Sequence, residues 1–436
     1  MPRTLPFETA LETVGTGPFQ KRLLLTFGLV WAADAMQVLA IGFTVVSIAA
    51  SFGLSVPQAL QTGTLFFLGM LVGAFVFGRL ADRIGRRNVL IITILLDAVF
   101  GIASAFAPDF TWLLALRFLT GLGVGGTLPV DYAMMAEFLP PKKRGRWLVM
   151  LEGAWAPGTV LVALAALAVQ QSGAAEPWRV LFLITGLPAV IGLFIRLWVP
   201  ESPMYLLRQG RTAEARAILD TMAARNGTTL PEGELVLPAE RQGGSIFSAA
   251  LRGVTLPILV VWLLVSMSYY GVFVWLPVQL AGQGFGFVRG HLFLVLVALA
   301  QIPGYALAAY GVERWGRKPT LIGFLVLSAL GCGLYALGLN AALVTTATLL
   351  MSFALLGTWG ALYVITPELY PTELRATGMG SAGAMARLGG LLAPSLLAPV
   401  MAASFAGALA LYAALLLVAA FAVTRIGVET RNRALA

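Results

Sequence analysis

The sequence contains one cysteine, Cys332, and one histidine, His291, among 436 residues. A single cysteine excludes a disulfide framework and a cysteine metal cluster, and a single histidine excludes a multi-histidine metal site. No pairing of a nucleophile with a general base is visible in the sequence either. The residues therefore predict neither a metal nor another cofactor, and they do not indicate an enzyme.

Charged residues are also scarce. They make up 11% of the chain, whereas soluble proteins carry about 25%. Hydrophobic residues reach 59% and the mean hydropathy is +0.87. The net charge of +9 does not indicate a nucleic acid partner, because the basic residues fall between apolar stretches and not along one face. This composition predicts an all-α protein embedded in a lipid bilayer.

The apolar residues form long runs, each suited to the roughly 20 residues that a spanning helix needs. The first run is far longer than the 7–15-residue core of a signal peptide, so we expect it to remain as a helix. The pattern predicts twelve transmembrane helices. The runs lie at 23–51, 59–80, 88–107, 111–137, 147–170, 178–199, 254–281, 288–311, 319–338, 342–366, 377–402 and 404–425.

Lysine and arginine cluster in alternate connections between these runs, for example at Arg83 to Arg87 and at Lys142 to Arg146. Because basic residues favour the cytoplasmic side, both termini are predicted to be cytoplasmic. Residues 200–252 turn polar and contain an expected amphipathic helix at Thr212–Ala224. We therefore predict a six-helix half at 1–199, a cytoplasmic linker at 200–252 and a second six-helix half at 253–436.

An internal repeat supports this division. The segment 81–87 corresponds to 312–318 at an offset of 231 residues, and Glu137 corresponds to Glu368 at the same offset. Each glutamate is followed seven residues later by an arginine, Arg144 or Arg375. Parallel repeats of this kind are typical of transporters that rock two halves around a central site.

At this level the chain resembles the major facilitator superfamily over essentially its whole length. The cytoplasmic signature of that superfamily is similar to GRLADRIGRR, from Gly78 to Arg87. RFLTGLGVGG, from Arg117, and PESPMYLLRQGR, from Pro200, resemble its sugar-porter and organic-ion branches. WAADAMQV, from Trp31, and SAGAMARLGGLLAP, from Ser381, look most like the group of bacterial niacin transporters and synaptic-vesicle-related proteins.

Several charges near the cytoplasmic ends of the helices are expected to act in gating. On the resemblance, the motif residues Asp82 and Arg86 would latch the cytoplasmic side. Glu137 with Arg144, and Glu368 with Arg375, would form further ion pairs in the outward-facing state. Each pair would be worth about 0–1 kcal/mol. In another interpretation, these charges only anchor loops in the cytoplasm. The expected gating residues are Asp82, Arg86, Asp131, Glu137, Arg144, Glu152, Glu368 and Arg375.

Four charges fall inside the predicted bilayer, where each one costs about 2.5–3.5 kcal/mol on insertion scales. By resemblance to proton-driven sugar porters, Asp34 and Arg117 would carry proton coupling; a fixed ion pair is the alternative. Asp97 is expected to be a polar helix-packing residue. Arg387 offers a planar fork that matches a carboxylate, which indicates an organic anion as substrate, with an acidic side chain as its alternative partner.

Aromatic residues on the expected cavity-facing helices predict a pocket for a flat ring. We select Trp31, Tyr270 and Trp359, with Gln37 as a donor and acceptor, for substrate binding. The alternative is that these side chains mark the membrane interface or pack between helices.

The sequence therefore predicts a proton-coupled symporter for a small organic anion. Nicotinate or another aromatic carboxylate is the substrate that the resemblance implies. An organic cation transporter and a sugar–proton symporter are the alternatives, and a receptor that binds without transport is a further one. The compact chain without large outer loops predicts a bacterial inner membrane, and a monomer is the default expectation.

Overall fold

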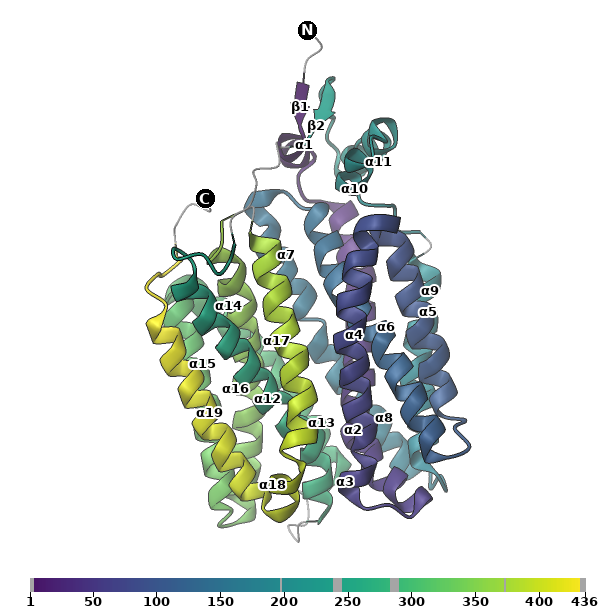
Figure 1. The fold of residues 1–436 in the computed structure, drawn as a ribbon, viewed down its shortest axis with the longest axis vertical. Coiled ribbons are helices and arrows are strands. Elements are labelled where there is room, and N and C mark those ends of the chain that lie inside the picture. Colours follow the sequence, from purple (N-terminus) through teal and green to yellow (C-terminus); the bar gives the residue numbers. More distant parts are fainter. Residues whose placement is uncertain (1–3, 197, 238–244, 283–289, 372–373, 432–436) are drawn as a thin grey trace.

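The structure is a computed structural model that describes residues 4–196, 198–237, 245–282, 290–371 and 374–431. It is almost entirely helical (Figure 1). The long helices are α2 (Pro18–Phe52), α4 (Gln61–Ile84), α5 (Arg86–Ser104), α6 (Phe110–Glu137), α8 (Trp155–Gln171), α9 (Pro177–Arg196), α12 (Arg252–Gly282), α14 (Gln301–Arg314), α15 (Arg317–Leu337), α16 (Ala341–Glu368), α17 (Arg375–Leu396) and α19 (Phe405–Arg425). The shorter ones are α1 (Phe7–Val14), α3 (Val56–Ala59), α7 (Pro141–Glu152), α10 (Pro203–Arg208), α11 (Thr212–Asn226), α13 (His291–Leu299) and α18 (Ala398–Ala403).

A helix occupies most of each of the twelve predicted runs; residues 288 and 289 lie outside the described part. Four runs are interrupted: 59–80 divides at its start into α3 and α4, 147–170 into α7 and α8, 288–311 into α13 and α14, and 377–402 into α17 and α18. Within the described residues, eleven helices, some of them formed by two such segments, are long and apolar enough to cross a membrane. The run at 377–402 is not among them, because α17 consists largely of small residues and carries an arginine at its centre.

The long helices form two groups that stand side by side (Figure 1). We call α2 to α9 the N-terminal bundle and α12 to α19 the C-terminal bundle. The bundles meet where α4 packs on α17, α2 on α12 and α8 on α13. Glycines allow the closest approaches inside a bundle. A Cβ atom at Gly121 or Gly125 of α6 would overlap the backbone of α4.

Both chain ends lie at one end of the molecule, together with α10 and α11 (Figure 1). We call this the linker end. The helix predicted at Thr212–Ala224 is confirmed as α11; residues 238–244 of the predicted linker lie outside the described part. The all-α prediction needs one correction, because strand β1 (Thr4–Pro6) pairs in parallel with β2 (Glu234–Val236). The strands join the start of the chain to the segment that follows α11, a long-range pairing that no local pattern encodes.

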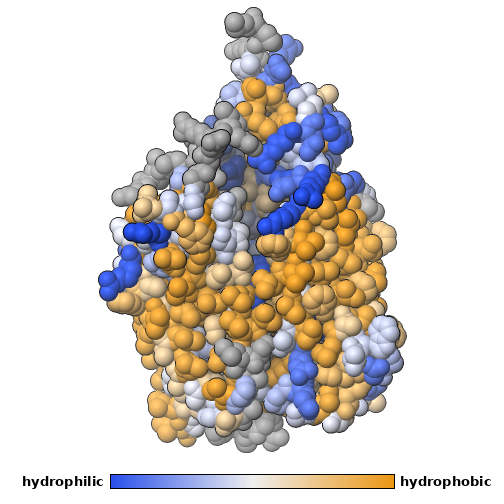
Figure 2. Space-filling view, viewed as in Figure 1, coloured by the Kyte–Doolittle hydropathy of each residue, from blue (hydrophilic) through white to orange (hydrophobic). Residues whose placement is uncertain are grey.

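The surface agrees with a bilayer environment. Figure 2 shows hydrophobic side chains over most of the flank of the helices and hydrophilic ones gathered around the linker end. Large apolar side chains such as Phe75, Phe106 and Phe194 are more than half exposed. Such exposure would be unfavourable in water but is the expected state of a lipid-facing surface.

Candidate substrate cavity

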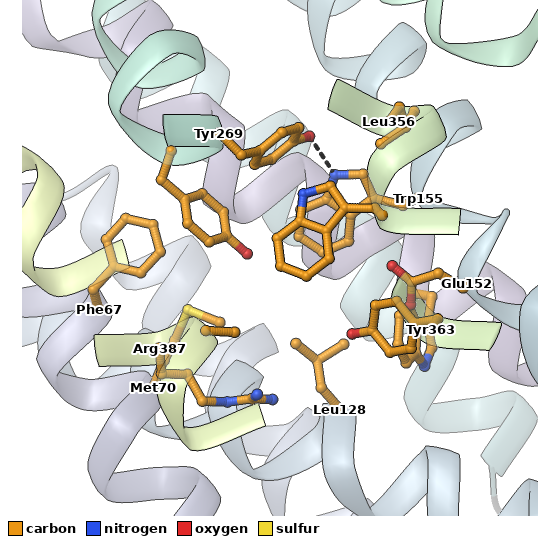
Figure 3. A pocket seen from close by; sticks show the side chains of 13 residues that line it. Phe67, Met70, Leu128, Glu152, Trp155, Tyr269, Leu356, Tyr363 and Arg387 are labelled. Carbon is orange, nitrogen blue, oxygen red and sulfur yellow. Dashed lines mark hydrogen bonds between the residues drawn. The ribbon is translucent and has the colours of Figure 1, made fainter. Parts of the chain in front are cut away.

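A cavity lies between the two bundles, about midway along the helices. Its empty space is about 520 Å³, open solvent at its mouth included. Both bundles contribute to the wall, which combines aromatic side chains with one acidic and one basic residue (Figure 3). The lining residues are Trp31, Phe67, Met70, Leu128, Glu152, Trp155, Tyr269, Tyr270, Leu356, Trp359, Tyr363, Ala386 and Arg387.

Aromatic contacts hold much of this wall in place. Within the C-terminal bundle, the rings of Tyr269 and Trp359 meet edge to face at 6.0 Å. Between the bundles, Phe67 of α4 lies 4.8 Å from Tyr270 of α12, measured between ring centroids. Trp155 of α8 donates an indole hydrogen bond of 2.8 Å to the Tyr269 hydroxyl (Figure 3). The rings therefore close the cavity and connect the two bundles.

Arg387 projects into the cavity from α17 (Figure 3). Its Nη1 donates 2.8 Å to the carbonyl of Gly383, one turn earlier in the same helix. Its Nε has no hydrogen-bond partner among the described residues. The glycines and alanines of α17 leave the guanidinium space to face the cavity instead of packing against a neighbouring helix. The fork is thus anchored at one nitrogen and has donors left for a ligand.

Glu152 is the last residue of α7, directly before the break that separates α7 from α8. Its carboxylate lines the cavity on the side opposite Arg387 and accepts a 3.3 Å hydrogen bond from Tyr305 of α14. The sequence predicts Glu152 nearer the cytoplasmic end of the helix, as a gate contact. That position needs correction, because the 12 residues of α7 carry the carboxylate well into the molecule.

Arg117 and Gln37 form a separate buried cluster inside the N-terminal bundle, and both are fully buried. Arg117 donates 3.0 Å to Gln37 Oε1 and 3.2 Å to the Gln37 carbonyl, and its guanidinium lies 4.6 Å from the ring centre of Phe66 and 4.5 Å from that of Phe182. Asp97 is close enough to interact electrostatically with Arg117. Gln37 therefore does not line the central cavity, unlike the other predicted substrate residues, Trp31, Tyr270, Trp359 and Arg387.

The acidic side chains of this region, Asp97, Asp34 and Asp131, are all buried. Asp97 was expected only to pack helices, yet its charge faces Arg117. Its spacing from Arg117 along the chain gives no signal of this, because the two residues meet through the packing of α5 on α6. Asp34 is buried on α2, one turn from Trp31 and one turn from Gln37. Asp131 is buried on α6, beyond the lining residues of the cavity.

An ion cluster joins three elements of the N-terminal bundle at the linker end. Arg86, at the start of α5, contacts Asp82 at 3.0 Å and Glu137 at 3.3 Å. The Ser202 hydroxyl donates to Glu137. Glu201 accepts from the backbone N–H groups at the start of α5, where a carboxylate complements the helix dipole. Three predicted gating residues, Asp82, Arg86 and Glu137, are thus brought together.

The C-terminal bundle repeats this cluster. Arg317, at the start of α15, contacts Glu368 at 2.9 Å, and Thr430 donates to the same carboxylate. Glu429 accepts from the backbone N–H groups of Arg317 and Lys318. Burial opposes ionisation of Glu429, but these two N–H groups, together with those of Thr430 and Arg431, outweigh it and lower the pKa of the carboxyl below its ordinary value. The internal repeat therefore extends to the polar contacts.

The pairing expected for the two glutamates differs in this structure. Arg144 donates 3.3 Å to the Leu139 carbonyl, and Arg375 donates 2.8 Å to the Pro367 carbonyl. Glu137 and Glu368 instead take their ion pairs from the arginine that begins the neighbouring helix. The seven-residue spacing along the chain could not reveal this, because the partner comes from another helix.

At the end opposite the linker, the bundles are in tight contact. A Cβ atom at Gly42 of α2 would overlap the backbone oxygens of Phe273 and Val274 of α12. Phe43 lies 6.5 Å from the imidazole of His291, measured between ring centres. The two bundles are therefore in contact at this end of the molecule.

Comparison with known proteins identifies the family. The family model for the Major Facilitator Superfamily matches residues 23–394. The chain belongs to the major facilitator superfamily. It is therefore a multi-pass membrane transporter for a small molecule and not an enzyme. This confirms the resemblance found in the sequence.

Individual relatives narrow the comparison. The niacin transporter of Acinetobacter baylyi is 36% identical over 98% of both chains. A putative niacin/nicotinamide transporter of Bacillus subtilis is 35% identical over 95% of this chain and 97% of its own length. The synaptic vesicle 2-related protein of Xenopus laevis is 32% identical over 99% of this chain and 82% of its own.

Among solved structures, the xylose transporter of E. coli in a partially occluded inward open conformation shares the fold. It has a TM-score of 0.76 and 20% identity, covering 95% of this chain and 99% of that one.

Proposed function

We propose that this transporter carries a small aromatic monocarboxylate, with nicotinate as the leading candidate, together with a proton. The observation that carries the proposal is Arg387, whose guanidinium faces a cavity walled by aromatic rings. An arginine fork pairs with a planar carboxylate through two parallel hydrogen bonds. The names of the two bacterial relatives support the same substrate.

The aromatic wall fits the other part of such a molecule. Trp31 comes from α2, Tyr270 from α12 and Trp359 from α16, so the rings surround the cavity from several directions. A pyridine ring held by Arg387 through its carboxylate would lie among them, in edge-to-face or offset contact. We propose these four residues as the substrate site.

The transport cycle would follow from the two bundles. We propose twelve spanning helices, the eleven long apolar ones and α17 as the twelfth, with the linker end in the cytoplasm. The division remains 1–199, 200–252 and 253–436. The bundles would rock around the cavity, and the ion clusters at the linker end, with Arg144 and Arg375, would act as gates. Asp34 and Arg117 remain the sequence-based candidates for proton coupling.

The cellular setting is also proposed. The bacterial relatives favour a bacterial inner membrane. A monomer would suffice, because both walls of the cavity come from one chain.

Uptake of radiolabelled nicotinate into proteoliposomes with an inward proton gradient tests the proposal. Removing one partner of a buried, hydrogen-bonded charge pair costs about 2–5 kcal/mol, so Arg387→Ala should weaken nicotinate binding about 30-fold or more. Arg387→Lys should bind nicotinate more weakly than the native protein but more tightly than Arg387→Ala, because an ammonium keeps the positive charge but cannot form the two parallel hydrogen bonds. Arg425→Ala, at the end of α19, is the matched control and should bind as the native protein does.

The opposite results are equally clear. The native protein could neither bind nor move nicotinate and instead unfold at a higher temperature with an organic cation or a sugar. That result would show that the proposed substrate is wrong and would leave the fold unaffected. Binding without movement under any gradient would indicate a receptor.

A further inference from the structure

Glu152 faces Arg387 across the cavity and is the only acidic side chain among the described residues that line it. It is 5% exposed, and it is close enough to Arg387 for the two charges to interact. Its carboxylate accepts from the Tyr305 hydroxyl and lies within hydrogen-bonding reach of the Tyr363 hydroxyl, and its Oε2 lacks a partner of good geometry among the described residues. An ionised carboxylate with a poorly paired oxygen is costly in such a place, which makes Oε2 a suitable place for a proton.

The other titratable groups around Glu152 do not replace Arg387 as its counter-charge. They are hydroxyls, neutral near physiological pH: Tyr132 from α6, Tyr269 and Tyr270 from α12, Tyr305 from α14 and Tyr363 from α16. From α2, Trp31 lines the cavity and Asp34 lies one turn further along. The charge of the cavity wall itself is therefore set by Glu152 and Arg387.

The charge of this pair changes with its ligands. With no substrate, Glu152 and Arg387 cancel. A bound monocarboxylate adds one negative charge, and a proton alone would add one positive charge. The pair returns to zero only when anion and proton are bound together. Because a net charge inside the membrane is expensive, the empty and the doubly loaded carrier are the two forms suited to reorientation.

We propose that Glu152 is the proton-carrying group of this transporter and that Arg387 links its protonation to anion binding. When the substrate carboxylate takes the guanidinium, Glu152 loses its counter-charge and Oε2 binds a proton from water in the open cavity. When the anion leaves, the O–H bond breaks, the proton returns to water, and the carboxylate faces Arg387 again.

The placement of Glu152 connects this exchange to the movement of the bundles. The carboxylate belongs to the N-terminal bundle, whereas Tyr305 and Arg387 belong to the C-terminal one. Protonation would remove an attraction between the bundles at the moment when the anion occupies the guanidinium. Glu152 lies at the junction of α7 and α8, which together form one candidate span from Arg144 to Gln171, so its carboxylate is carried by a helix that crosses the N-terminal bundle.

The inference rests on the proposed anion substrate, and its test separates the two. Glu152→Gln in proteoliposomes should exchange nicotinate across the membrane at near-native rates but lose accumulation driven by a proton gradient. A pH dye trapped inside should report proton entry with nicotinate for native protein and none for the variant. Glu214→Gln on the exposed α11 is the control for carboxylate loss, and Asp34→Asn tests the sequence-based candidate.

Each result decides between the alternatives. If Glu152→Gln accumulates nicotinate as well as the native protein does, the proton-carrying role of Glu152 is overturned. The proposed anion substrate is not affected by that result. Loss of exchange together with accumulation in Glu152→Gln would make Glu152 a ligand-binding or structural residue and would also overturn the proton-carrying role. Native protein that does not bind nicotinate would overturn the proposed function, and this inference with it.

Discussion

At the residue scale, Arg117 and Arg387 have different surroundings although both lie in helices of the predicted bilayer region: Arg117 is fully buried and Arg387 is half-buried. Arg117 is enclosed by Gln37, two phenylalanine rings and the nearby charge of Asp97. Arg387 has one contact within its own helix and otherwise faces the cavity. Arg117 thus makes its contacts within the N-terminal bundle, whereas Arg387 is positioned to bind a ligand in the cavity.

Gln37 provides a test of this distinction. Gln37→Leu would remove the amide oxygen that accepts from Arg117, and a hydrogen bond to a charged group contributes about 1.5–3 kcal/mol. We expect a lower unfolding temperature with unchanged nicotinate affinity, measured by thermal unfolding in detergent and by equilibrium binding. A variant of native stability with weakened binding would instead favour the sequence-based role of Gln37 as a substrate ligand.

At the element scale, close contact between α4 and α6 depends on glycine. Gly121→Ala would push a methyl group into the Phe66 carbonyl, and such overpacking costs about 1–3 kcal/mol. We expect a lower unfolding temperature, measured with the purified protein. Gly323→Ala of α15 is the matched control, since its added Cβ meets no atom within 4 Å. Equal stability of the two variants would contradict the packing argument.

The start of α15 gives a prediction on pH. Because the pKa of Glu429 is lowered in the folded protein, its stabilisation is present above the ordinary glutamate value of about 4.3 and is lost as the pH falls through the lowered value. An anion at a helix N-terminus is worth about 0.3–1 kcal/mol. Native protein should therefore unfold at a higher temperature than Glu429→Gln at pH 7, and the difference should shrink below about pH 4. A difference independent of pH would argue against the ionised cap.

The elements also show how far local patterns reach. The helices of all twelve runs were predicted from the length of the apolar stretches and α11 from its amphipathic pattern, because these signals lie within each segment. The β1–β2 pairing and the partners of Glu137 and Glu368 were not, because they join segments far apart in the chain.

At the scale of the whole molecule, the proposed transport of a proton with a monoanion moves no net charge. A membrane potential supplies about 2.3 kcal/mol per charge per 100 mV, but only to a step that moves net charge. Nicotinate accumulation should therefore follow an imposed pH gradient and change little with a potassium diffusion potential at fixed pH. A steep rise of uptake with voltage would require a different stoichiometry.

The sequence alone determined the membrane class, the helical segments, the internal repeat and the family, because each is written in composition, periodicity or a contiguous motif. It also named four of the residues that line the cavity, Trp31, Tyr270, Trp359 and Arg387. Only the tertiary structure decided which charges meet. In the folded protein Glu152 lies opposite Arg387, Gln37 accepts a hydrogen bond from Arg117, and Glu137 forms an ion pair with Arg86. Helix packing sets these distances, because the residues are far apart along the chain.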